Sequence, residues 1–245
     1  MSPIYVPGKV TLKKESVAAD PYYNNVSLLL HGDGTNGSTT IVDSSPSPKT
    51  VTAVGNAQIS TAQSKFGGSS LLCGSGGITG YFTTPLVSDF QFGTGDFTLE
   101  MWLYPTATGD FKIALSNYTS FSSEAFLISR SSNVNTTKWQ FTSAGIYPPD
   151  LTSTTNAVDN DWTFIAVVRS GNTKTLYVNG IAESSQNYPF SMNGVGPSLW
   201  IGGVGDSPST GDFKGYMDEL RITKGIARYT ANFTPPTAPF PEVLG

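Results

Sequence analysis

An alternation of apolar and polar side chains over residues 97–104 is the clearest pattern in the chain. Apolar side chains occupy every second position, and this period of two residues predicts a β-strand. One face of the strand would pack on a core, and the other would stay available to a ligand, as in antiparallel sheets with one covered face. That second face carries Thr98, Glu100, Trp102 and Tyr104.

Shorter runs of strand type recur along the chain, separated by turns rich in Gly, Pro, Asn and Asp. They cover residues 26–31, 39–43, 49–54, 69–73, 78–83, 112–116, 125–130, 138–142, 162–169, 174–179, 198–202 and 215–223. Asn179 and Gly180 suit a type I′ turn, which predicts a hairpin over residues 174–184. Only residues 225–229 suggest a short helical turn, with Tyr229 and Phe233 on one side. The even spacing predicts an all-β fold, a sandwich of two antiparallel sheets.

Composition supports one large domain. The 245 residues include 26 Gly and 16 Pro, and only 13% are charged, which suits many short strands joined by turns. Residues 1–25 hold three prolines and a small basic cluster without a sustained pattern, so we interpret them as an N-terminal arm for attachment or oligomer contact. Residues 26–241 form the predicted domain, and residues 242–245 a short tail.

Charge and cysteine content exclude several classes of protein. A net charge of −4 and a pI near 4.9 leave no basic surface for nucleic acid. No apolar run is long enough to span a bilayer, and the N-terminus lacks the apolar centre of a secretion signal. The one cysteine, Cys73, cannot form an internal disulfide and is predicted to be a core residue of a protein assembled in a reducing cytosol.

The sequence offers few residues that could catalyse hydrolysis. A retaining glycosidase needs two carboxyl groups about 5–5.5 Å apart. The best pair, Asp96 and Glu100, would lie roughly 13 Å apart along one strand. A single histidine, His31, leaves no basis for Ser-His-Asp or His-cluster chemistry. The sequence therefore predicts a protein that is not an enzyme.

Five blocks together resemble a known family: KFGGSSLL at 65–72, GTGDFTLEMWLYP at 93–105, WTFIAVVRSGNTKTLYVNG at 162–180, LWIGG at 199–203 and GYMDELRITKGIARYTANFTPP at 215–236. They are similar to the laminin G-like, concanavalin A-like jelly roll, in the version found in tail and appendage proteins of bacterial viruses. The resemblance implies a jelly-roll sandwich with one concave sheet and a frequent calcium site at its edge. The fold serves lectins, adhesion modules and glycosidases alike, so it does not fix the function.

A metal site is predicted from one acidic residue in the last strand. By parity, Asp218 shares a face with Leu220 and Ile222, and a carboxylate buried there needs a partner. In proteins that this chain resembles, the first and last strands are neighbours, which would bring Asp218 near Gly32 and Asp33. Carboxylates and backbone carbonyls are typical ligands of Ca²⁺. The predicted structural calcium site consists of Gly32, Asp33, Asp43 and Asp218, and the alternative is that Asp218 accepts backbone N–H groups.

A sugar site needs aromatic faces beside polar groups. Glu100, Trp102 and Tyr104 form such a row on the central strand, and loop tyrosines could extend it. The alternative is that Trp102 packs under a loop and that the tyrosines cover edges. Trp139, Trp162 and Trp200 lie in strand patterns and are predicted to be core residues. The predicted ligand-binding set is Glu100, Trp102, Tyr104, Tyr118, Tyr147 and Tyr188.

The expected function is that of a non-catalytic virion appendage, in a tail, fibre or decoration, that binds host-surface glycans. A purely structural virion adaptor without sugar binding is the alternative, and a laminarinase-like glycosidase is the third. The expected partners are other virion proteins through the arm and a host glycan. The family resemblance favours a homo-oligomer, with a trimer as the first choice. The expected location is the virion surface, after synthesis in the host cytoplasm.

Overall fold

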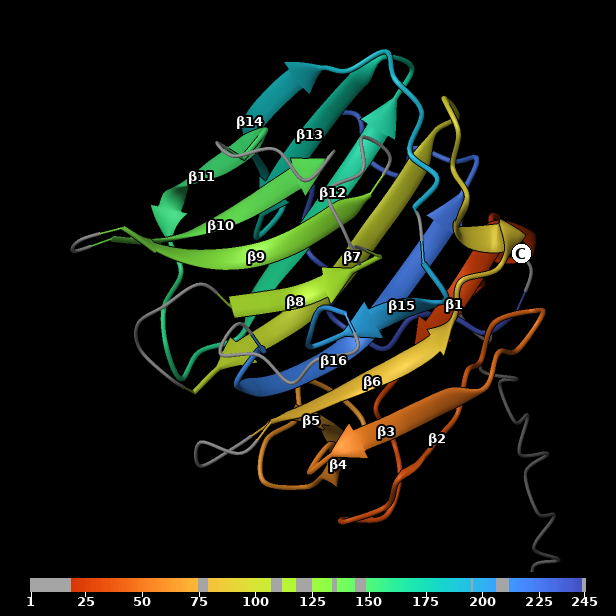
Figure 1. Cartoon of the computed structure of the whole chain (residues 1–245), viewed down its shortest axis with the longest axis vertical. Coiled ribbons are helices and arrows are strands. Elements are labelled where there is room, and N and C mark those ends of the chain that lie inside the picture. Colours follow the sequence, from red (N-terminus) through yellow and green to blue (C-terminus); the bar gives the residue numbers. More distant parts are fainter. Residues whose placement is uncertain are drawn as a thin grey trace, which may run out of the picture.

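The computed structural model describes residues 19–74, 79–106, 112–117, 125–133, 136–143, 149–194, 196–205 and 212–243. Two antiparallel sheets lie face to face (Figure 1). The first contains, in spatial order, β14 (Ile181–Asn187), β13 (Thr173–Val178), β12 (Thr163–Ser170), β7 (Phe97–Pro105), β16 (Gly215–Lys224), β5 (Ser70–Cys73) and β4 (Gln58–Ser60), and β1 (Val26–Leu30) also pairs with β16. The second contains β11 (Leu151–Asn156), β10 (Thr136–Ser143), β9 (Phe126–Asn133), β8 (Lys112–Ser116), β15 (Ser198–Ile201), β6 (Gly80–Pro85), β3 (Val51–Gly55) and β2 (Thr40–Ile41).

The predicted all-β sandwich is confirmed. Its helical content in the described residues is two short 3₁₀ turns, η1 (Tyr23–Asn25) and η2 (Ser88–Phe90). None of the helices in this part of the chain has the length and apolarity needed to cross a membrane. Two strands, β4 and β11, were not predicted from the sequence, because β4 is short and β11 is polar. β11 is held by tertiary contacts, since the Glu183 carboxylate on β14 accepts the backbone N–H groups of Thr154 and Thr155 at 2.8 and 2.9 Å.

The core lies between the sheets, where the predicted inner face of β7 packs. Its four apolar side chains are fully buried in the main hydrophobic cluster, as the alternation predicts. Trp139 belongs to this cluster, and Cys73 is a buried free thiol whose pKa burial raises to about 12. The hairpin turn is also confirmed, because Asn179 and Gly180 have φ values of 49° and 79°.

The outer face of β7 is not open, which corrects the prediction. Residues 225–243, here called the C-terminal strap, run across it and form a second hydrophobic cluster against the sheet. In this cluster the Tyr229 and Phe233 rings stack at 3.6 Å, and the Phe233 ring packs edge-on to Phe164. The main contributors from the sheet are Trp102, Phe164, Ala166, Val168 and Tyr177.

The predicted helical turn at 225–229 is wrong, because the backbone donors of the strap bond to the sheet rather than to each other. Gly225 N donates to the Asp96 carbonyl at 2.7 Å, and Phe233 N donates to the Gly180 carbonyl at 2.9 Å. Arg228 N donates to Thr98 Oγ1 at 3.0 Å. Tyr229 and Phe233 therefore share a side without a helix.

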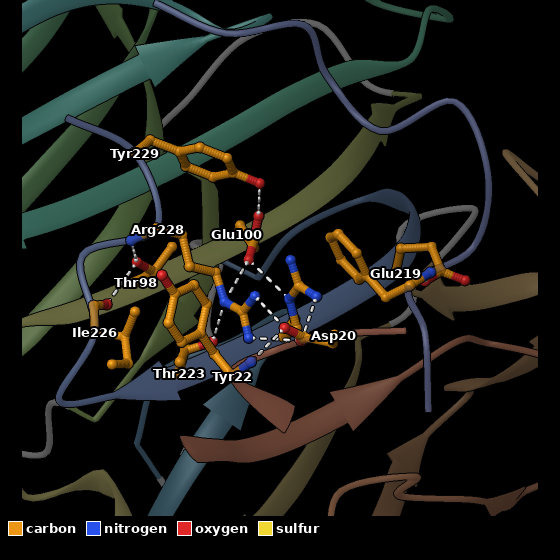
Figure 2. A network of polar contacts seen from close by, with 11 residues as sticks. Asp20, Tyr22, Thr98, Glu100, Glu219, Thr223, Ile226, Arg228 and Tyr229 are labelled. Atoms are coloured by element: carbon orange, nitrogen blue, oxygen red, sulfur yellow. Dashed lines mark hydrogen bonds and ion pairs between the residues drawn. The ribbon is translucent and has the colours of Figure 1, made fainter. Parts of the chain in front are cut away.

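Buried charges fix the strap to the sheet, as Figure 2 shows. Arg228 forms a bidentate pair with Asp20, at 2.9 and 2.7 Å. Arg221 on β16 donates to both acids, to Asp20 at 3.1 Å and to Glu100 at 2.8 Å. The Tyr229 hydroxyl donates to the second Glu100 oxygen at 2.7 Å. Two acids and two bases thus balance inside the protein, as buried charges require.

The same network holds residues that the sequence assigned to the arm. Asp20 is 3% exposed, and its backbone N–H donates to the Val243 carbonyl at 2.8 Å. The Tyr23 hydroxyl donates to the Ser44 carbonyl at 2.7 Å. Residues 1–18 lie outside the described residues. Residues 20–25 therefore contact the sandwich, and the first described residues lie beside the last.

A β-bulge in β16 changes the parity on which the metal prediction rested. Its pairing with β7 shifts between Asp218 and Arg221, and Glu219 has a φ of 52°. As a result Leu220 and Ile222 face the core, whereas Asp218 lies opposite Trp102 on the outer side. The expectation that Asp218 shares a face with Leu220 and Ile222 is wrong, because an extra residue shifts the alternation.

The bulge also supplies an anchor for the end of the strap. Glu219 accepts the Phe240 N–H at 2.7 Å and contacts His31 Nδ1 at 2.8 Å, while His31 Nε2 lies 3.0 Å from Glu242. Burial alone would lower the pKa of His31, but the two carboxylates raise it above its ordinary value. His31 therefore ties β1, β16 and the strap together.

Removing one member of the charge network should be costly. We expect Arg221→Met to lower the free energy of unfolding by about 3–5 kcal/mol, since Glu100 and Asp20 keep buried charge with fewer partners. Adding Glu100→Gln in the same chain should recover part of this loss, because it removes one uncompensated charge. Urea denaturation measures both changes. Lys138→Met, at a lysine that bonds only a backbone carbonyl in the described residues, is the control. A double variant as unstable as the single one would contradict the charge argument.

Candidate functional site

A groove of about 580 Å³ opens on the outer side of the first sheet, beside the strap. β7 contributes Trp102 to it, the residue before β12 contributes Trp162, and the β13–β14 turn contributes Asn179. The loop before β5 and the strap form the remaining walls. The lining residues are Lys65, Phe66, Trp102, Trp162, Asn179, Thr234, Pro235, Pro236 and Thr237.

Aromatic rings follow one another along this side of the sheet. The Tyr104 ring centroid lies 5.3 Å from Trp162 and 5.8 Å from Tyr216. All three side chains are half-buried, so part of each ring faces solvent. Trp102 is more enclosed, with Phe66 edge-on to it at 6.3 Å. The arrangement offers flat apolar surfaces beside polar groups, which is the chemistry that sugar rings require.

The Lys65–Phe66 wall of the groove is fixed by Asp218. Its Oδ2 atom accepts the backbone N–H groups of Lys65 at 2.6 Å and Phe66 at 3.2 Å. Its Oδ1 atom is buried without a hydrogen-bond partner in the described part of the chain. Burial raises the pKa of Asp218 to about 7 despite the two donors, and the charges of Glu219 and Asp33 add to the shift.

The structure separates the residues predicted for sugar binding. Trp102 and Tyr104 lie at or beside the groove. Glu100 is fully buried under the strap, and its carboxylate is engaged by Arg221 and Tyr229, so it presents no surface to a ligand. Tyr188 belongs to the core between the sheets, where Lys174 Nζ lies 3.5 Å from its ring centroid. Tyr118 and Tyr147 lie outside the described residues.

The four residues of the predicted calcium site also have different surroundings. Both carboxylate oxygens of Asp43 already accept hydrogen bonds within the protein, from the backbone N–H groups of Leu29, Ser45 and Lys49 at 3.0, 2.9 and 2.7 Å. The Gly32 carbonyl accepts a hydrogen bond from the Ser69 hydroxyl at 3.0 Å. The exposed Asp33 carboxylate packs against Gly67, where φ is +62° and a side chain would clash with it.

The described residues contain no group of three or more His, Cys, Asp or Glu side chains that could hold a metal ion. Asp33 and Asp218 are electrostatically coupled across the loop that includes Gly67. Calcium prefers six to eight oxygen ligands. The calcium prediction therefore rests on this pair of carboxylates, and it stays a prediction.

Three groove residues were missed or misassigned from the sequence. Trp162, predicted to be core, lies half-exposed beside Tyr104. The strand that follows it is apolar on both faces, and such a run carries no parity signal to show which side is inner. Lys65 and Phe66 belong to a turn whose backbone N–H groups bond to the distant carboxylate of Asp218, a contact with no signal in the local sequence. In contrast, Trp200 is fully buried, as predicted.

Comparison with known proteins points to the same fold. The family model described as the concanavalin A-like lectin/glucanases superfamily, Laminin_G_3, matches residues 75–227. A search of curated proteins finds no match.

Similar solved structures come from several bacterial proteins. Domain 4 of AbnA, a GH43 extracellular arabinanase from Geobacillus stearothermophilus solved with arabinotriose, is 19% identical with a TM-score of 0.58, covering 83% of this chain and 94% of that one. The binding domain of Paraclostridial Mosquitocidal Protein 1 is 15% identical with a TM-score of 0.60, covering 84% and 50%. The botulinum neurotoxin serotype D binding domain is 13% identical with a TM-score of 0.60, covering 85% and 50%. This chain spans about half of the two toxin domains, and at these identities the likeness concerns the fold.

The raised pKa of Asp218 gives a testable dependence of stability on pH. Because the pKa rises from 3.8 to about 7 on folding, its contribution to stability is complete below pH 3.8 and is lost as the pH rises through 7. Asp218→Asn keeps an acceptor for Lys65 and Phe66 but cannot ionise. We expect its melting temperature to exceed that of the wild type by a margin that grows between about pH 4 and 7 and is then constant. Asp218→Ala, which also loses the acceptor, should be less stable than Asp218→Asn throughout. A margin independent of pH would contradict this.

Calcium binding can be tested on metal-stripped protein. A metal that binds only the folded state at about 100 times its dissociation constant adds about 2.7 kcal/mol of stability. We expect calcium to raise the melting temperature, and Asp33→Asn to abolish the rise. Identical melting curves with and without calcium would refute the metal site.

Proposed function

Because the chain belongs to the concanavalin A-like lectin/glucanases superfamily, we propose that it is a carbohydrate-binding domain and that the groove beside the strap is its binding site. The observation that carries the proposal is the series of half-exposed rings formed by Trp162, Tyr104 and Tyr216 next to that groove. Half-exposed aromatic rings on a rigid sheet can stack on the C–H faces of sugar rings without reordering the protein. Domain 4 of AbnA, solved with arabinotriose, is consistent with this use of the fold.

We further propose that binding is not followed by hydrolysis. Glu100 is held by an arginine and a tyrosine in the charge network. Asp218 has the raised pKa of a general acid, but it is fully buried and is not among the groove residues. The groove lining contains no carboxyl side chain at all. A glycosidase mechanism needs a pair of accessible carboxyl groups, so these contacts favour a binding role.

The biological setting proposed from the five sequence blocks is an appendage of a bacterial virus. In this setting the domain would be exposed on the virion surface, attached through the arm to other virion proteins and repeated in a homo-oligomer. Its glycan would be on the host surface. A structural adaptor without sugar binding is the alternative, and it differs by one measurable property, the absence of any glycan ligand.

Glycan binding through the groove can be tested on an oligosaccharide array, with dissociation constants measured for the ligands found. We expect Trp162→Ala to weaken binding about 5-fold or more, because stacking on an aromatic face contributes on the order of 1 kcal/mol. Phe190→Ala is the matched control, since Phe190 is exposed and its ring packs on Tyr188, not in the groove. A blank array would favour the structural adaptor, and equal losses in both variants would remove the groove as the site.

A further inference from the structure

The groove differs from the rest of the protein in the sign of its charge. The chain carries a net charge of −4, yet the lining residues include one lysine and no carboxyl side chain. Two acidic residues that contact the backbone of groove residues accept hydrogen bonds there. Asp218 is buried behind Lys65 and accepts its backbone N–H, and Asp161 accepts the backbone N–H of Trp162 at 2.8 Å. The groove is therefore a local exception on an acidic protein.

Among the described residues Lys65 forms no ion pair, whereas several other cations do. Arg221 and Arg228 pair with Asp20, Lys174 pairs with Asp150, and Lys49 pairs with Asp89. Within the described ranges no carboxylate lies within ion-pair distance of Lys65. Its Nζ atom instead lies 3.8 Å from the Trp102 ring centroid and 5.9 Å from that of Phe66. The contact with Trp102 holds the ammonium group at the groove wall.

Other polar groups of the groove are also hydrogen-bond donors. Trp102 is 6% exposed, and its Nε1–H has no hydrogen-bond partner among the described residues. Asn179 uses its Oδ1 atom to accept the Phe164 N–H at 2.9 Å, which leaves its amide NH₂ to offer. A buried donor without a partner is costly. The Asn179 amide and the Lys65 ammonium group suit a ligand rich in acceptors and negative charge, whereas the Trp102 Nε1–H is buried beneath them.

We infer that the groove selects anionic sugars, with Lys65 as the residue that determines specificity. This inference rests on the proposed function, because it assigns the chemical class of ligand to the same groove. Trp162 would contact the apolar face of the sugar ring, and the ring's carboxylate or sulfate group would lie against the Lys65 ammonium group. A neutral sugar would leave that ammonium and the neighbouring donors without an anionic partner. The groove would therefore bind the anionic sugar more tightly than its neutral counterpart.

The test compares matched probes that differ only in charge. Oligogalacturonate and its methyl ester examine a carboxylate, and a keratan sulfate oligosaccharide and its desulfated form, which has no uronic acid and is neutral, examine a sulfate. Titration calorimetry should give at least one anionic probe a dissociation constant 10-fold or more below that of its neutral counterpart. Raising the salt concentration should weaken the anionic probe and leave the neutral one unchanged.

Substitutions at Lys65 then assign the preference. Lys65→Met keeps an aliphatic chain over Trp102, so we expect it to abolish the preference for the anionic probe while neutral binding changes less than 2-fold. Lys65→Arg should retain the preference, and Lys138→Met, outside the groove, should leave it unchanged.

Equal affinity for both members of each pair, or equal losses of both in Lys65→Met, would overturn the inference. If the neutral probes still bind and Trp162→Ala weakens them, the proposed function stands without it. Binding of all probes that is insensitive to Trp162→Ala would overturn the proposed function itself.

Discussion

The buried charge network is the constraint on which the outer half of the structure depends. Asp20 and Glu100 hold Arg221 and Arg228 in a single cluster that links the strap to the centre of the sheet, and Figure 2 shows it beside the hydrogen bonds that Thr98 makes with Ile226 and Arg228 of the strap. Charges at this depth persist only when they are paired with good geometry. Because the strap carries one of the arginines, the sheet can bury its central acid only with the strap in place.

The position of the strap decides where a ligand can bind. It buries Glu100 and most of Trp102, and the same segment supplies one wall of the groove. Beside the strap, aromatic surface stays partly accessible at Tyr104, Trp162 and Tyr216. The strap therefore covers the site predicted at Glu100 and, together with Trp102 of the same strand, forms the groove.

The β16 bulge links this outer layer to the loop that faces it. By adding a residue between Asp218 and Arg221, it places Asp218 beneath the Lys65–Phe66 wall and lets Arg221 reach Glu100. The extra residue, Glu219, anchors His31 and the end of the strap. One backbone irregularity thus supports the charge network, the groove wall and the closure of the two ends of the chain.

The sequence by itself determined the fold class, the inner face of β7 and the Asn179–Gly180 hairpin, because these follow from local periodicity and turn chemistry. It also identified Trp102 and Tyr104 as aromatic residues of an outer face. Only the tertiary structure decided that this face is covered, that Asp218 changes sides and that Lys65 reaches Trp102. The reason is that these features depend on contacts between residues far apart in the sequence. Asp20 and Arg228, for example, are 208 positions apart. A bulge or a covering segment also produces no repeating pattern of apolar and polar residues from which it could be predicted.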